Sequence, residues 1–284
     1  MDKIRKEKIA FAVIKILAYI SVVFLAMLVG YIFFKGFRVI NFRFLTDVPR
    51  KGVTEGGIFP AILGTFYLVL VSFLVAVPTG VLSGIYLSEY APKEGAVIRF
   101  VRVSVNVLSG IPSVIFGLFG LAIFVNKFHF GVSILSGGLT LGILILPVII
   151  QATMEALRSV PNSFREASFG LGATKWQTVK NIVLPVGMPG ILTGVILSVG
   201  RSAGETAPIL FTAATFYTGR LPHSIFNEVM ALPYMIYGLL TEGTFPAKQI
   251  PIAYGASTVL LLFVFAMSLL AIIIRMRSRR MKKW

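Results

Sequence analysis

The chain has 284 residues, of which 56% are hydrophobic and only 13% are charged. Soluble domains carry roughly 25% charged residues, and disordered segments are poor in apolar residues, so the composition excludes both classes. The chain contains no cysteine, which excludes a disulfide framework, a thiolate metal site and a cysteine nucleophile.

Six stretches are long and apolar enough to cross a membrane as helices, which takes about 20 residues each. The first follows a charged head, but its apolar run is too long for a cleaved signal peptide, so we expect it to be retained. Gly and Pro occur within several stretches, and membrane helices tolerate both. The sequence predicts an all-α, polytopic membrane protein with six transmembrane helices: Phe11–Phe34, Pro60–Leu87, Phe100–Val125, Ile134–Leu157, Pro189–Phe216 and Ala253–Ile274.

The distribution of Lys and Arg predicts how these helices are oriented. The net charge is +16, and with a cytoplasmic N-terminus 17 basic residues fall in internal segments and 8 in external ones. Because basic residues concentrate on the cytoplasmic side, we predict that both termini are cytoplasmic. The excess charge then lies in internal loops and in a basic tail at 276–284 that contacts anionic membrane lipid, and no nucleic-acid partner is expected.

Three connections are too long to be simple turns: external segments at 36–59 and 217–252, and an internal one at 158–187. The internal loop is predicted to form two short helices around a glycine turn, the second ending at Pro185. It has few charges and a compact apolar surface. On physical grounds this surface either packs under the protein's own helices or inserts into a groove of a partner.

The internal loop resembles the EAA loop of ABC importer permeases, whose pattern is EAA-x3-G-x9-I-x-LP. Only Ser168 departs from it, where the family usually has Ala. The resemblance implies a coupling helix before the fifth span that docks on a separate ATP-binding subunit. The chain has no phosphate-binding loop, so we expect no cofactor on it, with ATP and Mg bound by the partner ATPase. The predicted coupling residues are Glu166, Ala167, Gly172 and the aromatic anchor Trp176.

Two charged residues lie within the fifth span. Counted from Pro189 at about 1.5 Å per residue, Arg201 lies roughly 18 Å into the membrane, and Glu205 is one turn further on the same face. Pro208 cannot donate a hydrogen bond to the carbonyl of Gly204, which weakens the helix there. Two explanations stay open: an ion pair that locks this helix to a neighbour, or a substrate path in which Arg201 meets an anion.

The third span contains a polar stretch at a similar depth. Ser109 and Ser113 flank a helix break at Pro112, and Asn106 lies one turn before Ser109. Hydroxyl groups and broken backbone could line a polar route at the midplane, as in other transporters. Small residues and Ser are also common where membrane helices simply pack together.

The segments SGIPSVIFGLFG (109–120) and GRSAGETAPILF (200–211) are similar to those of phosphate-transport permeases of the PstA type. The similarity extends over about 60–275. It implies the permease subunit of an ATP-driven phosphate importer in the prokaryotic cytoplasmic membrane. The implied partners are a second, homologous permease subunit, two copies of an ATP-binding subunit and an extracytoplasmic phosphate-binding protein.

Other functions remain as alternatives. A permease of the same fold could transport another oxyanion, such as sulfate or molybdate. A channel or ion-coupled transporter leaves the apolar internal loop unexplained, and a membrane enzyme lacks a catalytic cluster, so we expect no enzymatic or metal site. We predict three regions: 1–59 with the head, first span and external loop, the permease domain at 60–275, and the basic tail at 276–284.

Overall fold

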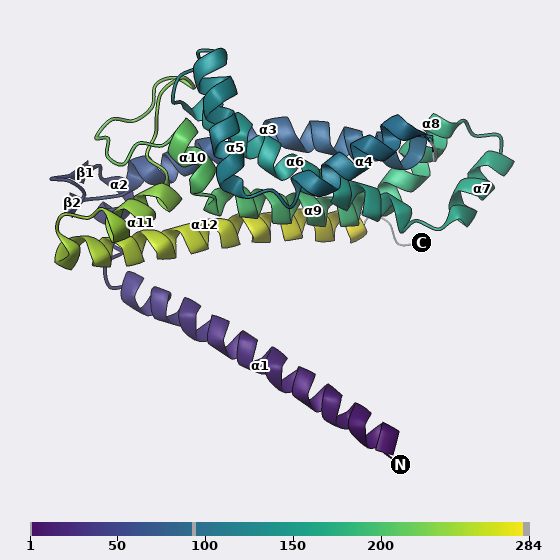
Figure 1. Ribbon diagram of the computed structural model, residues 1–284, viewed down its shortest axis with the longest axis horizontal. Coiled ribbons are helices and arrows are strands. Elements are labelled where there is room, and N and C mark those ends of the chain that lie inside the picture. Colours follow the sequence, from purple (N-terminus) through teal and green to yellow (C-terminus); the bar gives the residue numbers. More distant parts are fainter. Residues whose placement is uncertain (1, 93–94, 281–284) are drawn as a thin grey trace.

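The computed structural model describes residues 2–92 and 95–280 (Figure 1). Lys93 of an internal loop and residues 281–284 of the predicted basic tail lie outside the described residues. Over these described ranges the chain is all-α apart from one two-stranded hairpin. Its elements are α1 Asp2–Gly36, α2 Phe42–Thr46, β1 Pro49–Arg50, β2 Glu55–Gly56, α3 Phe59–Ile85, α4 Ala96–Leu108, α5 Ser113–Gly120, α6 Ile134–Arg158, α7 Asn162–Gly170, α8 Lys175–Thr178, α9 Leu184–Gly204, α10 Ala207–Thr212, α11 Leu232–Thr241 and α12 Pro246–Arg280.

Three of these helices are extended by wider, π-helical turns. They are η1 Tyr86–Tyr90 after α3, η2 Leu121–Lys127 after α5 and η3 Val179–Val183 between α8 and α9. With these extensions, the described residues contain five single helices that are long and apolar enough to cross a membrane, and a bent helix pair makes a sixth. The prediction of six membrane spans is confirmed. The five single helices are Glu7–Gly36, Phe59–Tyr90, Ile134–Arg158, Lys175–Gly204 and Pro246–Ile273.

The bent pair corrects the third predicted span. Residues 100–125 do not form one helix, because α4 ends at Leu108 and α5 begins at Ser113, with an angle of 107° between Ala96–Leu108 and Ser113–Lys127. Pro112 explains the break, since its ring disfavours helical geometry at the preceding residue and it has no N–H to donate. In Figure 1, α5 stands out from the bundle instead of continuing along it.

The fifth span also differs from its prediction, at both ends. It begins at Lys175 and not at Pro189, and it ends at Gly204, well before Phe216. Pro185 does not end the second helix of the internal loop. It lies in the first turn of α9 directly after η3, where the wider turn changes the hydrogen-bond register and the proline is accommodated. The last span likewise begins at Pro246 rather than Ala253.

Helices α3, α6 and α9 form the centre of the bundle, and α6 is buried along most of its length. Ile145, Ile149 and Leu157 of α6 are fully buried. Glycines allow the close approach: a Cβ on Gly80 of α3 would lie 2.8 Å from Ile149. Membrane helices associate through such tight packing because lipid provides little hydrophobic driving force between them.

A second core lies at the opposite end of the bundle from α7, which we call the α11 end. Phe44 of α2 is buried there among residues of α11 and α12. The buried side chain of Gln249 connects two loops: its Nε2 donates to the carbonyl of Gly52 at 3.0 Å, and its Oε1 accepts from Phe245 N at 2.9 Å. The segments 36–59 and 217–252 are therefore structured parts of the molecule.

Helix α1 leaves the bundle and contacts it only near its C-terminal end (Figure 1). There the Tyr31 and Tyr254 rings meet edge to face, and Thr258 Oγ1 donates to the carbonyl of Ile32 at 3.2 Å. None of its most apolar stretch is buried. An exposed apolar helix of 30 residues fits the prediction of a retained membrane span.

Candidate functional site

The fifth span breaks where the sequence places its two charges. Helix α9 ends at Gly204, Glu205 adopts an extended backbone (φ −72°, ψ 129°), and α10 begins at Ala207 with Pro208 in its first turn. A proline at that position needs no hydrogen-bond partner for its nitrogen, so it can start a helix but cannot continue the preceding one. Pro208 therefore marks a real helix break.

Arg201 and Glu205 form an ion pair within this broken segment. Arg201 Nε donates to Glu205 Oε1 at 3.1 Å, and the side chains are 50% and 14% exposed. Glu205 is the residue that caps α9, so the pair does not join α9 to another helix of the described chain. No other hydrogen bond of the Arg201 side chain occurs among the described residues. Its terminal N–H groups remain available to an anion.

The packing of α9 on α6 gives the depth of this pair. Gly194 of α9 lies against Ala152 of α6. Arg201 follows two helical turns later, about 10 Å along α9, which places it opposite the middle of the antiparallel α6. The depth counted from Pro189 used the wrong helix start: Arg201 lies three residues before the end of the helix Lys175–Gly204, and its position at the middle of the membrane follows only from its place opposite the middle of α6.

The break in the third span holds a small polar cluster. Ser109 Oγ donates to the carbonyl of Asn106 at 2.7 Å, and Gln151 Nε2 of α6 donates to Asn106 Oδ1 at 3.0 Å and to Ser109 Oγ at 3.3 Å. Sequence reasoning missed Gln151, although a glutamine inside an apolar span was a visible signal. An adjoining pocket of about 170 Å³ continues toward the α7 end, between Asn106, Gln151, Glu155 and Arg102.

The two helix breaks lie close to each other because α5 packs on α10. A Cβ on Gly117 would lie 3.0 Å from the carbonyl oxygen of Ala207 and from Pro208 Cα, so a larger residue here would push α5 and α10 apart. Pro112 precedes the first residue of α5, Ser113, which is half-buried. No hydrogen bond joins Arg201 or Glu205 to Ser109 or Ser113 in the described chain. The predicted path residues share one region without direct contact.

The predicted coupling segment, α7 and α8, projects from the α7 end of the bundle (Figure 1). Glu166 and Ala167 are exposed, and so is the Trp176 ring at 61%. Gly172 lies between the two helices with φ +81°, a conformation that side chains other than Gly and Asn rarely adopt. Thr174 and Gln177 form a capping box that begins α8. The glycine turn is therefore confirmed as a structural feature.

Ser168, the one departure from the EAA pattern, lies inside this segment. Its side chain is buried, and its hydroxyl is 2.9 Å from the hydroxyl of Thr178. This hydrogen bond connects α7 to the end of α8. The buried hydroxyl of Ser168 thus has a hydrogen-bond partner, and its short side chain still permits α7 and α8 to pack closely.

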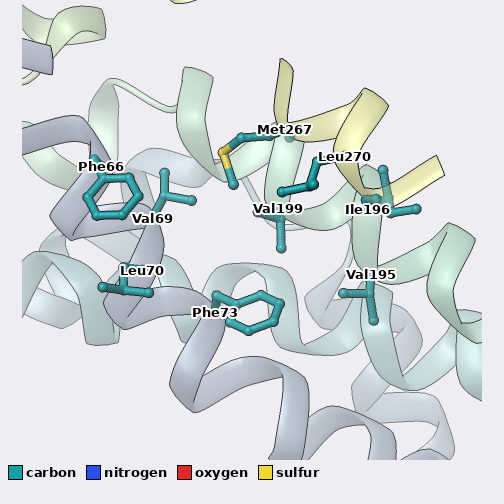
Figure 2. Close-up of a pocket in the computed structure, with 11 residues that line it drawn as sticks. Phe66, Val69, Leu70, Phe73, Val195, Ile196, Val199, Met267 and Leu270 are labelled. Carbon is teal, nitrogen blue, oxygen red and sulfur yellow. The ribbon is translucent and has the colours of Figure 1, made fainter. Parts of the chain in front are cut away.

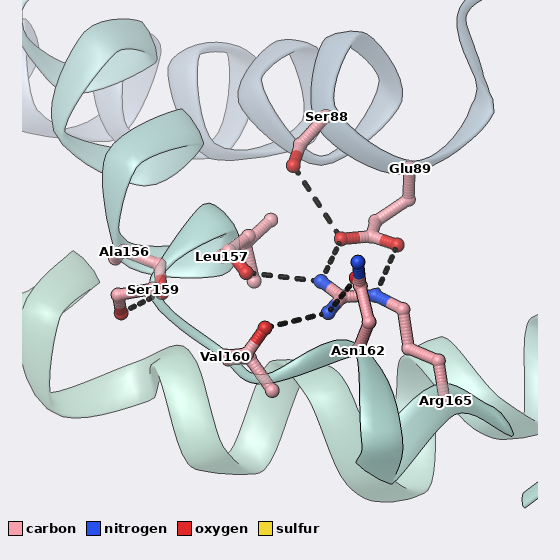
Figure 3. Close-up of polar contacts among 8 residues, drawn as sticks. All are labelled: Ser88, Glu89, Ala156, Leu157, Ser159, Val160, Asn162 and Arg165. Carbon is pink, nitrogen blue, oxygen red and sulfur yellow. Dashed lines mark hydrogen bonds and ion pairs between the residues drawn. The ribbon is translucent and has the colours of Figure 1, made fainter.

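An ion pair that sequence reasoning missed fixes α7 to the bundle (Figure 3). Arg165 Nη2 and Nε donate to the two carboxylate oxygens of Glu89, at 2.7 and 3.2 Å. Arg165 also donates to the carbonyls of Val160 and Leu157, at 2.8 and 3.0 Å. The Arg165 and Glu89 side chains are only 17% and 8% exposed. The two residues are 76 positions apart, so no local pattern reveals their pairing.

An apolar pocket of about 290 Å³ lies between α3, α9 and α12 (Figure 2). Its walls are hydrocarbon, apart from the Met267 sulfur, with Phe66 and Phe73 from α3 and Val199 from α9. An anion would lose its hydration there without gaining a donor, so this pocket does not suit an anion. Within the described residues there is also no group of three or more His, Cys, Asp or Glu that could hold a metal.

Comparison with known proteins assigns the family. Residues 76–283 match the model described as "Binding-protein-dependent transport system inner membrane component". The chain belongs to this family of ABC importer permeases. It is a multi-pass protein of the bacterial inner membrane, and in this family a partner subunit hydrolyses ATP.

Relatives of this permease include proteins with and without a stated cargo. The probable ABC transporter permease protein YqgI of Bacillus subtilis (strain 168) is 36% identical over 283 residues, covering 95% of each chain. Phosphate transport system permease protein PstA 1 of Mycobacterium tuberculosis (strain ATCC 25618 / H37Rv) is 37% identical over 230 residues, covering 80% of this permease and 72% of the relative.

A solved structure supports the same fold. The inward-facing MetNI methionine ABC transporter superposes with a TM-score of 0.61 at 17% identity, covering 78% of this permease and 97% of that chain. At this identity the likeness concerns the fold alone, and it agrees with the predicted all-α permease architecture.

Proposed function

We propose that this permease forms half of the path of an inorganic phosphate importer. The observation that carries the proposal is the ion pair at the break of α9, where a half-exposed Arg201 lies opposite the middle of α6 and keeps its terminal donors available. A guanidinium is a rigid fork of donors that matches a tetrahedral oxyanion. Glu205 holds that fork in place and offers it an alternative partner when the anion leaves.

The polar residues of α4 and α6 supply the next part of the path. Ser109, Asn106 and Gln151 form one hydrogen-bonded cluster, and the adjoining pocket leads to Arg102. The neutral donors of this cluster, followed by the Arg102 cation, suit an anion that must bind weakly enough to leave each site along a path. Ser113 and the breaks at Pro112 and Pro208 expose backbone in the same region.

The exposed coupling segment supports the proposed partners. The apolar side chains of Phe164, Phe169, Leu171 and Trp176 are all substantially exposed on it. Exposed aromatic anchors of this kind are typical of interface pockets. We place the ATP-binding subunit against this surface, on the cytoplasmic side, with ATP and Mg bound by that subunit and no cofactor on this chain.

The half-exposed face of Arg201 indicates what completes the path. One permease leaves this guanidinium open on its surface, and a second, homologous permease would enclose the path from the other side. An external phosphate-binding protein would deliver the anion at the α11 end. Two copies of the ATP-binding subunit, one for each permease, complete the proposed assembly.

Uptake of radiolabelled phosphate by the reconstituted complex tests the proposal. We expect uptake to require ATP on the side of the vesicle membrane that carries the ATP-binding subunits. Excess unlabelled phosphate should suppress the uptake, whereas sulfate and molybdate should not. ATP-dependent uptake that sulfate or molybdate suppresses as well as phosphate would favour the alternative, a permease for another oxyanion. The relative YqgI has no cargo in its name, so its similarity does not separate the two.

A further inference from the structure

A basic cavity lies beneath the coupling segment, between α7, α8, the end of α3 and α4. Its volume is about 580 Å³, and four of its ten lining residues are basic while only Glu89 is acidic. The four basic residues come from three separate parts of the chain: Arg102 from α4, Arg158 and Arg165 around the start of α7, and Lys175 from α8.

The cations on its walls are not all neutralised by the chain. Arg165 is balanced by Glu89, and Arg158 pairs with Glu155 at 3.1 Å on the exposed side. Lys175 Nζ lies 5.1 Å from the centre of the Tyr90 ring and is not paired with a carboxylate of the described chain.

Arg102 carries a further unused donor. Its Nη2 donates to the carbonyl of Leu87 at 2.8 Å, which holds the side chain against η1. Its Nε is buried and has no acceptor among the described residues. A buried donor without a partner is unfavourable, and more so on a charged group, so an acceptor that enters the cavity is favoured.

We infer that this cavity binds a phosphate group. A phosphate offers several acceptor oxygens at once, which suits the excess of cations and the unsatisfied Arg102 donor. The hydroxyls of Ser88 and Thr178 also line the cavity and can donate to the same group. A metal cation would meet four positive side chains against a single carboxylate already held by Arg165.

Two sources can supply this chemistry. One is inorganic phosphate dissolved on the α7 side, and the other is the headgroup of an anionic phospholipid. In both cases the bound group bridges Arg102 of α4 and Lys175 of α8, and so stabilises the coupling segment in its position on the bundle. Arg102 and Arg158 line both this cavity and the pocket of the proposed path, whereas Arg201 lines neither. The chemistry of the cavity follows from its own residues, whichever anion the permease transports.

The test measures binding to the full-length permease in two arms. In maltoside micelles, which contain no phosphate, equilibrium dialysis measures the Kd of radiolabelled inorganic phosphate. In nanodiscs that contain phosphatidylglycerol, native mass spectrometry measures how much of this lipid the released protein retains. The variants are Arg102→Gln and Lys175→Gln. Lys175 is exposed, so its variant will fold even where Arg102→Gln does not.

The matched controls are Arg99→Gln and Lys180→Gln. Each removes one exposed positive charge close to the tested residue, on α4 or beside α8, without touching the cavity. We expect Arg102→Gln and Lys175→Gln to weaken binding about tenfold or more, and the controls to change it less than about twofold. Arg201→Gln forms a third arm that measures phosphate bound in the proposed path: binding that this variant removes in micelles is assigned to the path, and binding that only the cavity variants remove is assigned to the cavity. It should leave the retention of phosphatidylglycerol unchanged.

The variants that lose binding, and the arm in which they lose it, show which source supplies the phosphate group and whether the cavity binds it at all. A selective loss of phosphate binding in micelles identifies the free anion as the occupant. A selective loss of retained phosphatidylglycerol, without phosphate binding in micelles, identifies the headgroup. Equal effects of the cavity variants and their controls, or no binding in either arm, would overturn the inference.

Discussion

Arg201 has one hydrogen-bonded partner in the described chain, and that partner caps its own helix. An ion pair that is half exposed on one side contributes little to stability, about 0–1 kcal/mol. The geometry therefore gives no support to a lock between neighbouring helices, the competing explanation of the two charges. In this geometry Glu205 orients the Arg201 guanidinium, whose other face lies exposed on the surface of the chain.

Arg201→Gln should reduce phosphate uptake at least about tenfold, because a charged hydrogen bond contributes about 1.5–3 kcal/mol. Arg201→Lys should recover little of it, since a point charge does not replace a fork of donors. Uptake of labelled phosphate is measured at equal amounts of assembled complex. Arg220→Gln, which removes an exposed charge in the segment 217–252, is the control and should transport normally.

The combined variant Arg201→Leu, Glu205→Leu distinguishes the two roles of the pair. If the charges only stabilise the protein, a single replacement leaves the other charge unpaired and destabilises it, and replacing both charges restores stability and transport together. If they belong to the anion path, the protein assembles and does not transport. Normal uptake by the combined variant would remove the pair from the path.

Glu89→Gln should destabilise the protein strongly, because it leaves the charge of Arg165 buried without its carboxylate. Breaking a buried pair in this way costs about 3–5 kcal/mol. The control is Glu155→Gln, which breaks the exposed pair with Arg158 and should cost less than about 1 kcal/mol. Denaturant unfolding in detergent compares the two variants, and equal shifts would contradict a structural role of the Glu89–Arg165 pair.

At the level of single residues, the sequence analysis singled out candidate residues that a local pattern marks. Arg201 and Glu205 are charges in an apolar span, and Gly172 belongs to a spaced motif. Glu89 was missed because it lies at the end of a span, where a charge is unremarkable, and because its partner is 76 positions away. Which far-separated side chains meet depends on packing that no local pattern encodes.

At the level of elements, the coupling segment depends on the turn at Gly172. Gly172→Asp places a charge on the exposed surface, and Asn and Asp tolerate the left-handed backbone better than other side chains. We expect assembly with the ATP-binding subunit, or transport by the assembled complex, to fall about tenfold. Co-purification and uptake measure the two effects.

Gly172→Asn is the matched control for this substitution. It has nearly the same shape and backbone tolerance as Asp and no charge, so it should assemble and transport close to normally. Normal assembly with normal uptake in Gly172→Asp would argue against docking at this surface. Equal defects in both variants would trace the effect to the turn itself rather than to the charge.

The helices themselves were largely predictable, because apolar length is a strong signal in a membrane protein. Ile134–Leu157 was predicted within one residue of α6. The start of the fifth span was wrong because Pro185 and Pro189 were taken as boundaries, whereas η3 and the helix around them accommodate both. The helix break at Pro112 was predicted, but the angle of 107° after it was not, since a proline indicates a break but not the direction taken after it.

At the level of the whole molecule, the orientation remains a prediction that rests on 17 internal against 8 external basic residues. A reporter fused after Trp284 should be active only in the cytoplasm, and one inserted near Gly219 only outside. Alkaline phosphatase and fluorescent-protein fusions measure this in intact cells. The reverse pattern would overturn the orientation and move the coupling segment to the external side.

The limits of the three predicted regions also remain a prediction. Residues 36–59 pack on α11 and α12 at the α11 end, while α1 extends away from the bundle. The apolar surface of α1 from Phe11 to Leu28 is exposed and has no cover from the rest of the described chain. Lipid or another subunit must therefore surround most of the first span.

The wide turns η1 and η3 lie on either side of the basic cavity, where the bundle meets the coupling segment. A π-helical turn contains one residue more than an α-helical turn. Moving that extra residue along a helix rotates the following side chains by about 100° and shifts them by about 1.5 Å, without breaking the helix. Because η3 joins α8 to α9, moving its extra residue along α9 would rotate the coupling segment relative to the bundle while α9 remains helical.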